Sequence, residues 1–192
     1  MADIIALLKE DHQKVKDLFE RIERSTERGT KTRTDLLARL AADLRVHMRF
    51  EEESFYPVVK AGADKAGREL TCEAYAEHDA ASAVLAKLEA IAPSDEMWKA
   101  NASVLKESVE HHIKEEEREL FKHAKSVLTK DELRRLGEQY AAMKREPDAS
   151  AAPTTKARSE DADRRGDDGD RRGDAPEEDD LDRQRGRPAA DL

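Results

Sequence analysis

Cysteine is nearly absent from this 192-residue chain, which contains only Cys72. One cysteine excludes an internal disulfide framework and any metal cluster built on several thiolates. Long hydrophobic runs are missing too, because the apolar run near the start, IIALL, is soon followed by charged residues. Neither a membrane span nor the core of a signal peptide fits so short a run. We therefore expect a cytoplasmic protein with no membrane association.

Basic residues are also fewer than acidic ones. The chain has 35 Lys and Arg residues against 44 Asp and Glu residues, which gives a formal net charge of −9. A chain with this balance has no overall basic field to attract nucleic acid. We therefore expect no nucleic-acid partner.

Aromatic residues are few, and all of them precede position 147. The segment 147–192 is dominated by charged and small residues, and its tetrapeptide RRGD occurs twice. A segment so poor in large apolar groups cannot compensate by burial for the entropy lost on ordering. The sequence thus predicts a folded domain at 1–146 and a disordered charged tail at 147–192.

Apolar residues in 1–146 repeat with the period of a helix, and no segment alternates as a strand does. Four long helices with short connections predict an all-α, up-and-down antiparallel four-helix bundle, with a short fifth helix added. The first two helices are expected from about 2 to 26 and from about 34 to 59. Gly62 and Gly67 break the pattern, so the third is expected from a cap at Thr71 to near Pro93. The fourth would begin at about Ser94, and the short fifth at the capping box TKDE at 129–132.

Polar residues interrupt two of the apolar stripes. In HMRFEEESFY, His47 and Glu51 take positions where leucine is expected. The same pattern returns 65 residues later in HIKEEERELF, with His112 and Glu116 in the corresponding places. The repeat favours His112 over its neighbour His111, which lies toward the charged flank of the helix. The domain therefore resembles a duplicated helical hairpin.

The first and third predicted helices correspond as well, at an offset of 66 residues, with His12 opposite His78. Because a helix rises by ~1.5 Å per residue, antiparallel packing places His12 level with His47 and Glu51 level with His78. The side chains expected to converge at the middle of the bundle are His12, His47, Glu51, His78, His112 and Glu116.

Two buried carboxylates without partners would cost several kcal/mol each, a large share of a domain's stability of ~5–15 kcal/mol. No Lys or Arg shares the stripes and could neutralise them. Histidine nitrogens with bridging carboxylates are ligands that borderline divalent metals accept inside helical bundles. Four histidines and two glutamates thus predict a site for two metal ions.

The ordered set His, His-x-x-x-Glu, His, His-x-x-x-Glu resembles the hemerythrin-like, or HHE cation-binding, domain over residues 1 to about 145. The resemblance implies a bundle with a non-haem centre of two iron ions that reacts with oxygen, hydrogen peroxide or nitric oxide. It further implies one iron at His12 and His47, the other at His78 and His112, and bridges from Glu51 and Glu116.

The chain differs from the oxygen carriers of that family. They have a second histidine one turn before the one equivalent to His78, where this chain has Ala74, and they end in His-x-x-x-x-Asp rather than His112-x-x-x-Glu116. Reversible oxygen carriage is therefore not expected. The coordination position beside His78 would go to water, to a phenol such as Tyr75, or to substrate.

The leading hypothesis is a di-iron protein that binds or consumes a small oxidant in stress defence or sensing, with weak peroxide- or oxygen-consuming activity. Two alternatives stay open: an iron-storage or iron-sensing module without redox chemistry, and a helical interaction module with a structural metal such as zinc. Whether Tyr75 or Tyr56 reaches the metal also stays open. We expect His123 near the end of the bundle, and the remaining acidic residues of the two motifs on the solvated flank or behind the ligands: Glu52, Glu53, Glu115 and Glu117.

Overall fold

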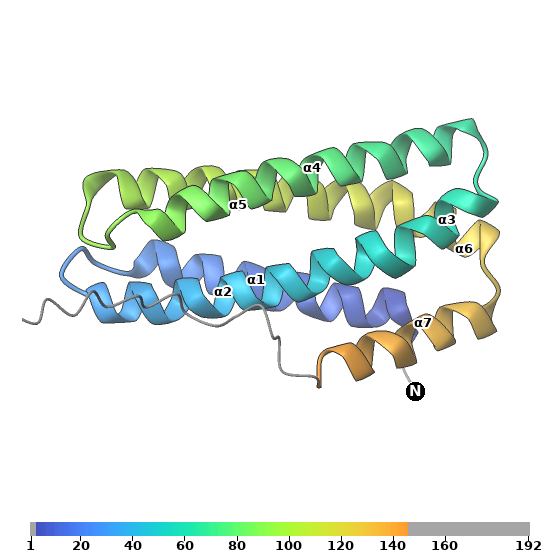
Figure 1. Cartoon of the computed structure of the whole chain (residues 1–192), viewed down its shortest axis with the longest axis horizontal. Helices are drawn as coiled ribbons and strands as arrows, with labels where there is room; N and C mark the ends of the chain where they lie inside the picture. Colours follow the sequence, from blue (N-terminus) through green and yellow to red (C-terminus); the bar gives the residue numbers. More distant parts are fainter. Residues whose placement is uncertain (1–2, 146–192) are drawn as a thin grey trace, which may run out of the picture. The chain divides into compact units, whose positions relative to one another are not determined.

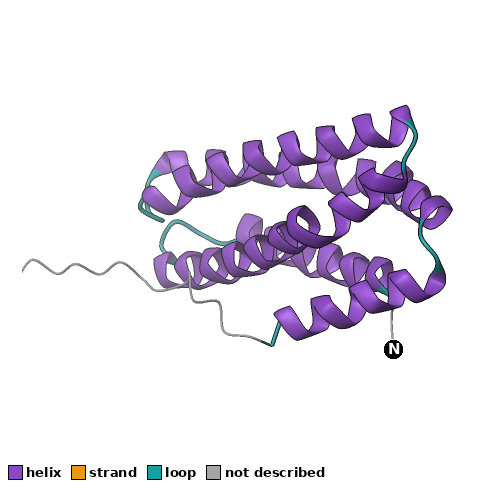
Figure 2. Cartoon of the chain, turned by 45° about the vertical axis from the view of Figure 1, so that its right-hand side comes forward, coloured by secondary structure: helices purple, strands orange, loops and turns teal. Residues whose placement is uncertain are grey.

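The computed structural model describes residues 3–145, and within this range it contains only helices and the loops between them (Figures 1 and 2). The predicted all-α class is therefore confirmed. The predicted tail at 147–192 lies outside the described residues. None of the helices within 3–145 is long and apolar enough to cross a membrane.

Seven α-helices and two π-helical segments form five helical rods in residues 3–145. The elements are α1 (Ile4–Arg24), α2 (Thr30–Phe50), η1 (Glu51–Phe55), α3 (Tyr56–Gly62), α4 (Lys65–Ala90), α5 (Glu96–Glu115), η2 (Glu116–Leu120), α6 (Phe121–Val127) and α7 (Lys130–Met143). The α2-η1-α3 and α5-η2-α6 runs are each continuous. Figure 1 shows four long rods side by side in alternating directions, with α7 as the short fifth rod.

Side-chain caps mark where several helices begin. Asp3 accepts a hydrogen bond from the backbone N–H of Ala6, and Asp95 accepts one from Met97. The predicted capping box at Thr129 and Glu132 is present at the start of α7. These caps satisfy backbone donors that the first helical turn leaves without partners.

The predicted start of the third helix was wrong, because α4 begins at Lys65 rather than near Thr71. Its cap is Asp64, whose Oδ1 accepts from the Gly67 N–H at 3.0 Å. Gly67 lies inside α4 and does not break it. A Cβ at this position would lie 1.9 Å from the ring of His123, so the helix has no room for a side chain here. The glycine thus marks a close approach between helices rather than a turn.

The second helix also begins earlier than predicted, at Thr30 rather than Thr34. Its first turn looks polar, but Arg33 is only 1% exposed. The guanidinium donates to the Pro93 carbonyl at 2.6 Å and lies 4.8 Å from the ring centroid of Trp98. A buried arginine with these partners stabilises a helical turn that polarity alone would assign to a loop.

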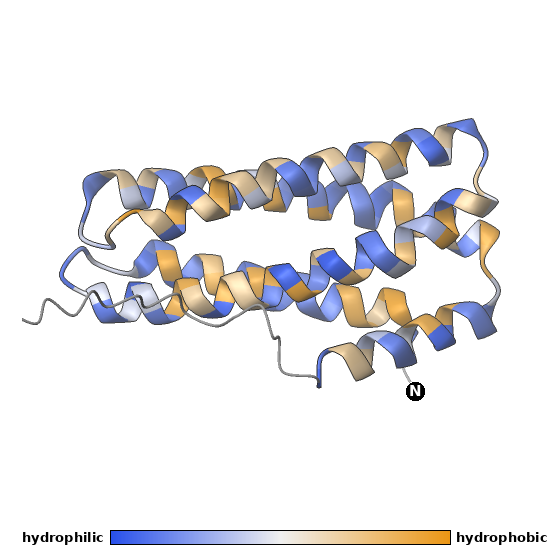
Figure 3. Cartoon of the chain, in the orientation of Figure 1, coloured by the Kyte–Doolittle hydropathy of each residue, from blue (hydrophilic) through white to orange (hydrophobic). Residues whose placement is uncertain are grey.

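The core divides into two apolar clusters. One contains residues of α1, α2, α4 and α5, among them Phe19, Leu40, Leu85 and Leu105. The other lies toward the opposite end of the rods and includes residues of α3, α6 and α7. Along each long rod the colours alternate between hydrophobic and hydrophilic, as amphipathic helices require (Figure 3). The polar residues predicted to bind metal lie near the points where the rods pass from one cluster to the other, as His12 does between Leu8 and Val15.

Candidate metal centre

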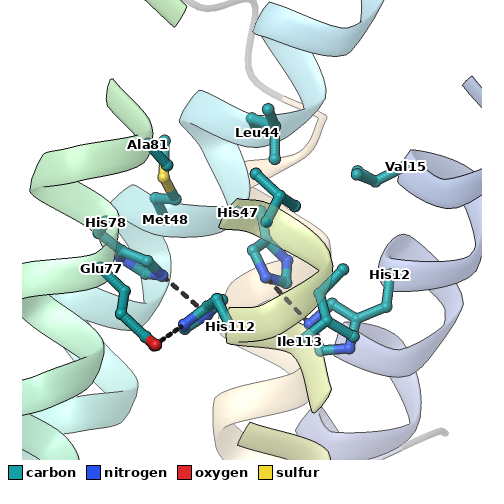
Figure 4. A pocket seen from close by; sticks show the side chains of 11 residues that line it. His12, Val15, Leu44, His47, Met48, Glu77, His78, Ala81, His112 and Ile113 are labelled. Carbon is teal, nitrogen blue, oxygen red and sulfur yellow. Dashed lines mark hydrogen bonds and ion pairs between the residues drawn. The ribbon is translucent and has the colours of Figure 1, made fainter. Parts of the chain in front are cut away.

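All six predicted side chains lie together at the middle of the bundle, and none is more than 6% exposed. The four imidazoles face one another in two pairs (Figure 4). The Nε2 atoms of His12 and His47 are 3.3 Å apart, and those of His78 and His112 are 3.1 Å apart. Each pair joins two helices, α1 with α2 and α4 with α5.

The two buried glutamates lie among these imidazoles. Glu51 Oε2 is 3.2 Å from His47 Nε2 and 3.3 Å from His78 Nε2, so one carboxylate oxygen faces both pairs. Glu116 Oε2 is 3.2 Å from His12 Nε2. The side chains thus form two overlapping groups of candidate ligands: His12, His47, Glu51 and Glu116 in one, and Glu51, His78 and His112 in the other.

Each glutamate begins a π-helical segment, η1 at Glu51 and η2 at Glu116. In η1 the backbone N–H of Tyr56 donates to the carbonyl of Glu51, a bond that spans five residues instead of four. The wider turn brings the side chain at 56 over the one at 51. Single π turns of this kind occur frequently at functional sites.

Tyr56 consequently reaches the centre of the site. Its hydroxyl lies 3.4 Å from Glu51 Oε2, 3.4 Å from Glu116 Oε1 and 3.3 Å from His78 Nε2. Burial raises the pKa of this phenol well above its usual value, and the two carboxylates add to the effect. Phe121 takes the equivalent place in the other repeat and stacks on His12, so a phenol is present on one side only.

Tyr75 does not point into the site. Its hydroxyl donates to the backbone carbonyl of Glu52 at 2.9 Å, and its ring packs edge-on against Tyr56. Of the two tyrosines that the sequence left open, Tyr56 is therefore the one whose oxygen lies among the candidate ligands.

Carboxylates from neighbouring helices hold the outer nitrogens of three histidines. His12 Nδ1 is 2.9 Å from Glu117, and His78 Nδ1 is 2.9 Å from Glu52. His112 Nδ1 is 2.8 Å from Glu77. An Nδ1–H that donates to a carboxylate leaves the Nε2 lone pair directed at the centre, which is the arrangement usual for metal-binding histidines.

These contacts place Glu52 and Glu117 behind the candidate ligands, one of the two positions expected for them. Glu77 was missed by the sequence reasoning. The repeat carried the signal, because Glu77 precedes His78 as Asp11 precedes His12. His111 is 64% exposed at its side chain and stays outside the site, and His123 bonds Asp64 at the end of the rods as expected.

The electrostatics of the site oppose positive charge on two of the histidines, His47 and His78. Burial lowers the pKa of His47 well below its usual value and that of His78 to about 3. Burial and the nearby Glu116 raise the pKa of Glu51. For Glu116, burial is outweighed by the contacts with His12, so its pKa falls to about 2. A buried carboxylate that stays ionised beside histidines that resist protonation forms a site suited to cations.

Several buried polar atoms here also have no hydrogen-bond partner, including Glu51 Oε1 and His47 Nδ1. Leaving such atoms without a partner in a protein interior costs ~1–3 kcal/mol each, and more when they are charged. Convergent imidazole nitrogens and carboxylate oxygens are donors that iron, zinc and manganese accept. The residues therefore fit a divalent metal centre.

The family model for the hemerythrin HHE cation-binding domain matches residues 3–124. The chain belongs to this family, as its ordered histidine and glutamate motifs suggested. The bundle and the buried His/Glu clusters are what a cation-binding member of this family is expected to contain.

Two known proteins are similar to this chain, one in structure and one in sequence. A crystal structure of a hemerythrin HHE cation-binding domain-containing protein from Mycobacterium kansasii has a TM-score of 0.66 and 29% identity, and the match covers 75% of this chain and 86% of that one. A DNA nickase from Nostoc sp. (strain PCC 7120) is 27% identical over 138 residues, which make up 72% of this chain. The match spans only 38% of the nickase.

Proposed function

We propose that the site holds two iron ions and reacts with a small oxidant, namely oxygen, hydrogen peroxide or nitric oxide, in stress defence or sensing. The observation that carries the proposal is the convergence of four imidazole nitrogens and two carboxylates in a buried layer without a lysine or arginine. The donors fall into two overlapping groups that share Glu51 and contain two imidazoles each, and such a set suits two carboxylate-bridged cations.

His12 and His47 would hold one iron, and His78 and His112 the other. Glu51 is suited to bridge them, because its Oε2 lies within 3.3 Å of an imidazole of each pair. Glu116 would be the second bridge. The Tyr56 hydroxyl is available as a further oxygen donor on the His78 side.

Bound iron would supply the electrons that reduce the oxidant, and the surrounding side chains would limit the size of the molecules that reach the iron. All four histidines border a cavity of about 20 Å³ whose other walls include Val15, Leu44 and Met48 (Figure 4). A second cavity of about 10 Å³ lies beside Ala74, His112 and Glu116. Each volume is close to that of one water-sized molecule, which restricts substrates to very small ones.

Ala74 favours turnover over reversible carriage. It lies one turn before His78 on the same face of α4 and is buried beside the smaller cavity. A histidine there could reach the same metal, whereas alanine offers no donor atom. A metal position not filled by protein is typical of catalytic rather than structural sites.

The test is to mix the reduced, iron-loaded protein with oxygen and, separately, with hydrogen peroxide, while the iron spectrum and gas evolution are followed. We expect rapid oxidation without a lasting oxygen adduct, measurable peroxide consumption, and slower turnover in Ala74→His. A stable adduct that releases oxygen unchanged under vacuum would instead assign the protein to the oxygen carriers.

We do not extend DNA nicking to this chain. The chain corresponds to little more than a third of the Nostoc nickase, and the net charge of −9 provides no basic field for a phosphate backbone.

A further inference from the structure

We propose that the two metal subsites are unequal: the subsite of His78 and His112 binds its metal more tightly, and the subsite of His12 and His47 releases its metal first. The cause would be helix α7, which holds the carboxylate that the repeat places beside His47. The inference rests on the proposed two-metal site and adds an order of loading to it.

The duplication supplies the comparison. In the second hairpin Glu77 precedes His78 and holds the Nδ1 atom of His112 at 2.8 Å. The equivalent pair in the first hairpin is Asp11 and His47. His47 Nδ1, however, is buried and has no hydrogen-bond partner. It is the only one of the four imidazoles in the site whose outer nitrogen meets no carboxylate.

Asp11 is engaged elsewhere. Its Oδ2 accepts from the hydroxyl of Tyr140, and Lys144 Nζ lies 2.6 Å from both of its carboxylate oxygens. Lys14 adds a third donor at 2.9 Å. Tyr140 belongs to α7 and Lys144 directly follows it, and within residues 3–145 the second hairpin has no equivalent of α7. Aspartate is also one methylene shorter than glutamate.

The missing partner matters for metal affinity. A carboxylate on Nδ1 fixes the orientation of the ring and makes Nε2 a stronger donor, and losing such a partner typically costs ~10–100-fold in metal affinity. The other donors nearly balance. Both subsites have two imidazoles and share Glu51, and Glu116 would serve both as the second bridge. Its Oε2 lies 3.2 Å from His12 Nε2, and its Oε1 lies 3.4 Å from the Tyr56 hydroxyl, which faces His78. The outer partner therefore decides the order.

The test is a calorimetric titration of the metal-free, full-length protein with ferrous iron under nitrogen. Repulsion between two cations gives the two binding steps different affinities even when the subsites are equal. The comparison of variants therefore decides which subsite binds its metal more tightly. Glu77→Ala should weaken the tighter step by ~10–100-fold and bring the two steps together. The inference is overturned if Glu77→Ala weakens only the looser step, or if the parent binds two irons with equal affinity.

Asp11→Asn is the matched control, because Asp11 holds the equivalent position but does not contact His47. We expect both iron affinities to stay within about threefold of the parent, since the supporting carboxylate on the outer nitrogen of His47 is already missing. A tenfold weakening of the looser step would show that Asp11 supports His47 and would overturn the inference.

A second measurement does not depend on any variant. In the zinc-loaded parent, proton exchange at the imidazole Nδ1–H groups can be followed by NMR. We expect slow exchange at His12, His78 and His112 and fast exchange at His47, and four equally protected protons would overturn the inference. Binding of one iron or none would overturn the proposed function together with this inference, whereas two irons of equal affinity would overturn the inference alone.

Discussion

At the scale of single residues, one extra residue in a helical turn changes which side chains meet. In a regular α-helix, positions 51 and 56 point in clearly different directions. The π-helical segment η1 brings them together, so that the Tyr56 hydroxyl lies among the candidate ligands. The same feature in η2 places Phe121 on His12. At this position the two halves of the site therefore differ by one aromatic pair, Tyr56 and Phe121.

We expect Tyr56→Phe to change the visible absorption of the iron-loaded protein, because it removes the hydroxyl that lies 3.3 Å from His78 Nε2. Tyr75→Phe is the matched control, since its hydroxyl bonds the backbone of Glu52 instead. The two spectra are compared with the parent at equal iron content. Identical spectra for Tyr56→Phe and the parent would show that the phenol does not contact the metal.

The sequence predicted the convergence of the six polar side chains because they recur at fixed offsets on helical stripes. It left the position of Tyr56 open, since the π-helical segment departs from the 3.6-residue period on which the stripes depend. Glu77 was missed for another reason. It lies beside the stripe of its own helix and acts across to His112 on the next one. Contacts between helices of this kind depend on packing, which periodicity does not describe.

At the scale of elements, the junction between α3 and α4 shows why a glycine need not end a helix. Gly67 lies in the first turn of α4, against the ring of His123 from α6. The predicted start of this helix was wrong because glycine was interpreted as a break, and the close neighbour that explains it is more than fifty residues away in the chain. The start of α7, where the hydroxyl cap Thr129 is followed by ordinary helix-forming residues, was predicted correctly.

Gly67→Ala should destabilise the protein by ~1–3 kcal/mol, because the new Cβ would overlap the ring of His123. The same substitution in a His123→Ala background should cost less, since the ring is gone and only the approach to the Ala63 Cβ at 2.9 Å remains. Chemical denaturation of the parent, the two single variants and the double variant measures the coupling energy between positions 67 and 123. An equal cost in both backgrounds would show that His123 is not what excludes a side chain at this position.

At the scale of the whole molecule, residues 3–145 contain both apolar clusters and the polar layer between them. The family match ends at residue 124, before α7, yet α7 contributes Leu133, Leu136 and Tyr140 to one of the clusters. The folded unit is thus larger than the part that defines the family. The domain boundary near 146 remains a prediction from composition.

A chain that ends at Glu146 should keep its helical content, its metal loading and its melting temperature. The reason is that the segment 147–192 contains no aromatic residue and few large apolar ones. Circular dichroism, metal analysis and thermal unfolding compare it with the full chain. A melting temperature lower by roughly 5 °C, the scale of a loss of ~1–2 kcal/mol, would show that the removed segment stabilises the bundle.

The most direct test of the account is the metal content of the aerobically purified protein, together with His47→Ala and His112→Ala, which each remove one imidazole from a different subsite. We predict about two irons per chain in the parent and a sharp loss of iron in both variants, with His111→Ala as the neighbouring control that keeps its iron. Folding of each variant is checked by circular dichroism. Stoichiometric zinc in the parent, or unchanged iron in both variants, would contradict the assignment of a di-iron centre to these residues.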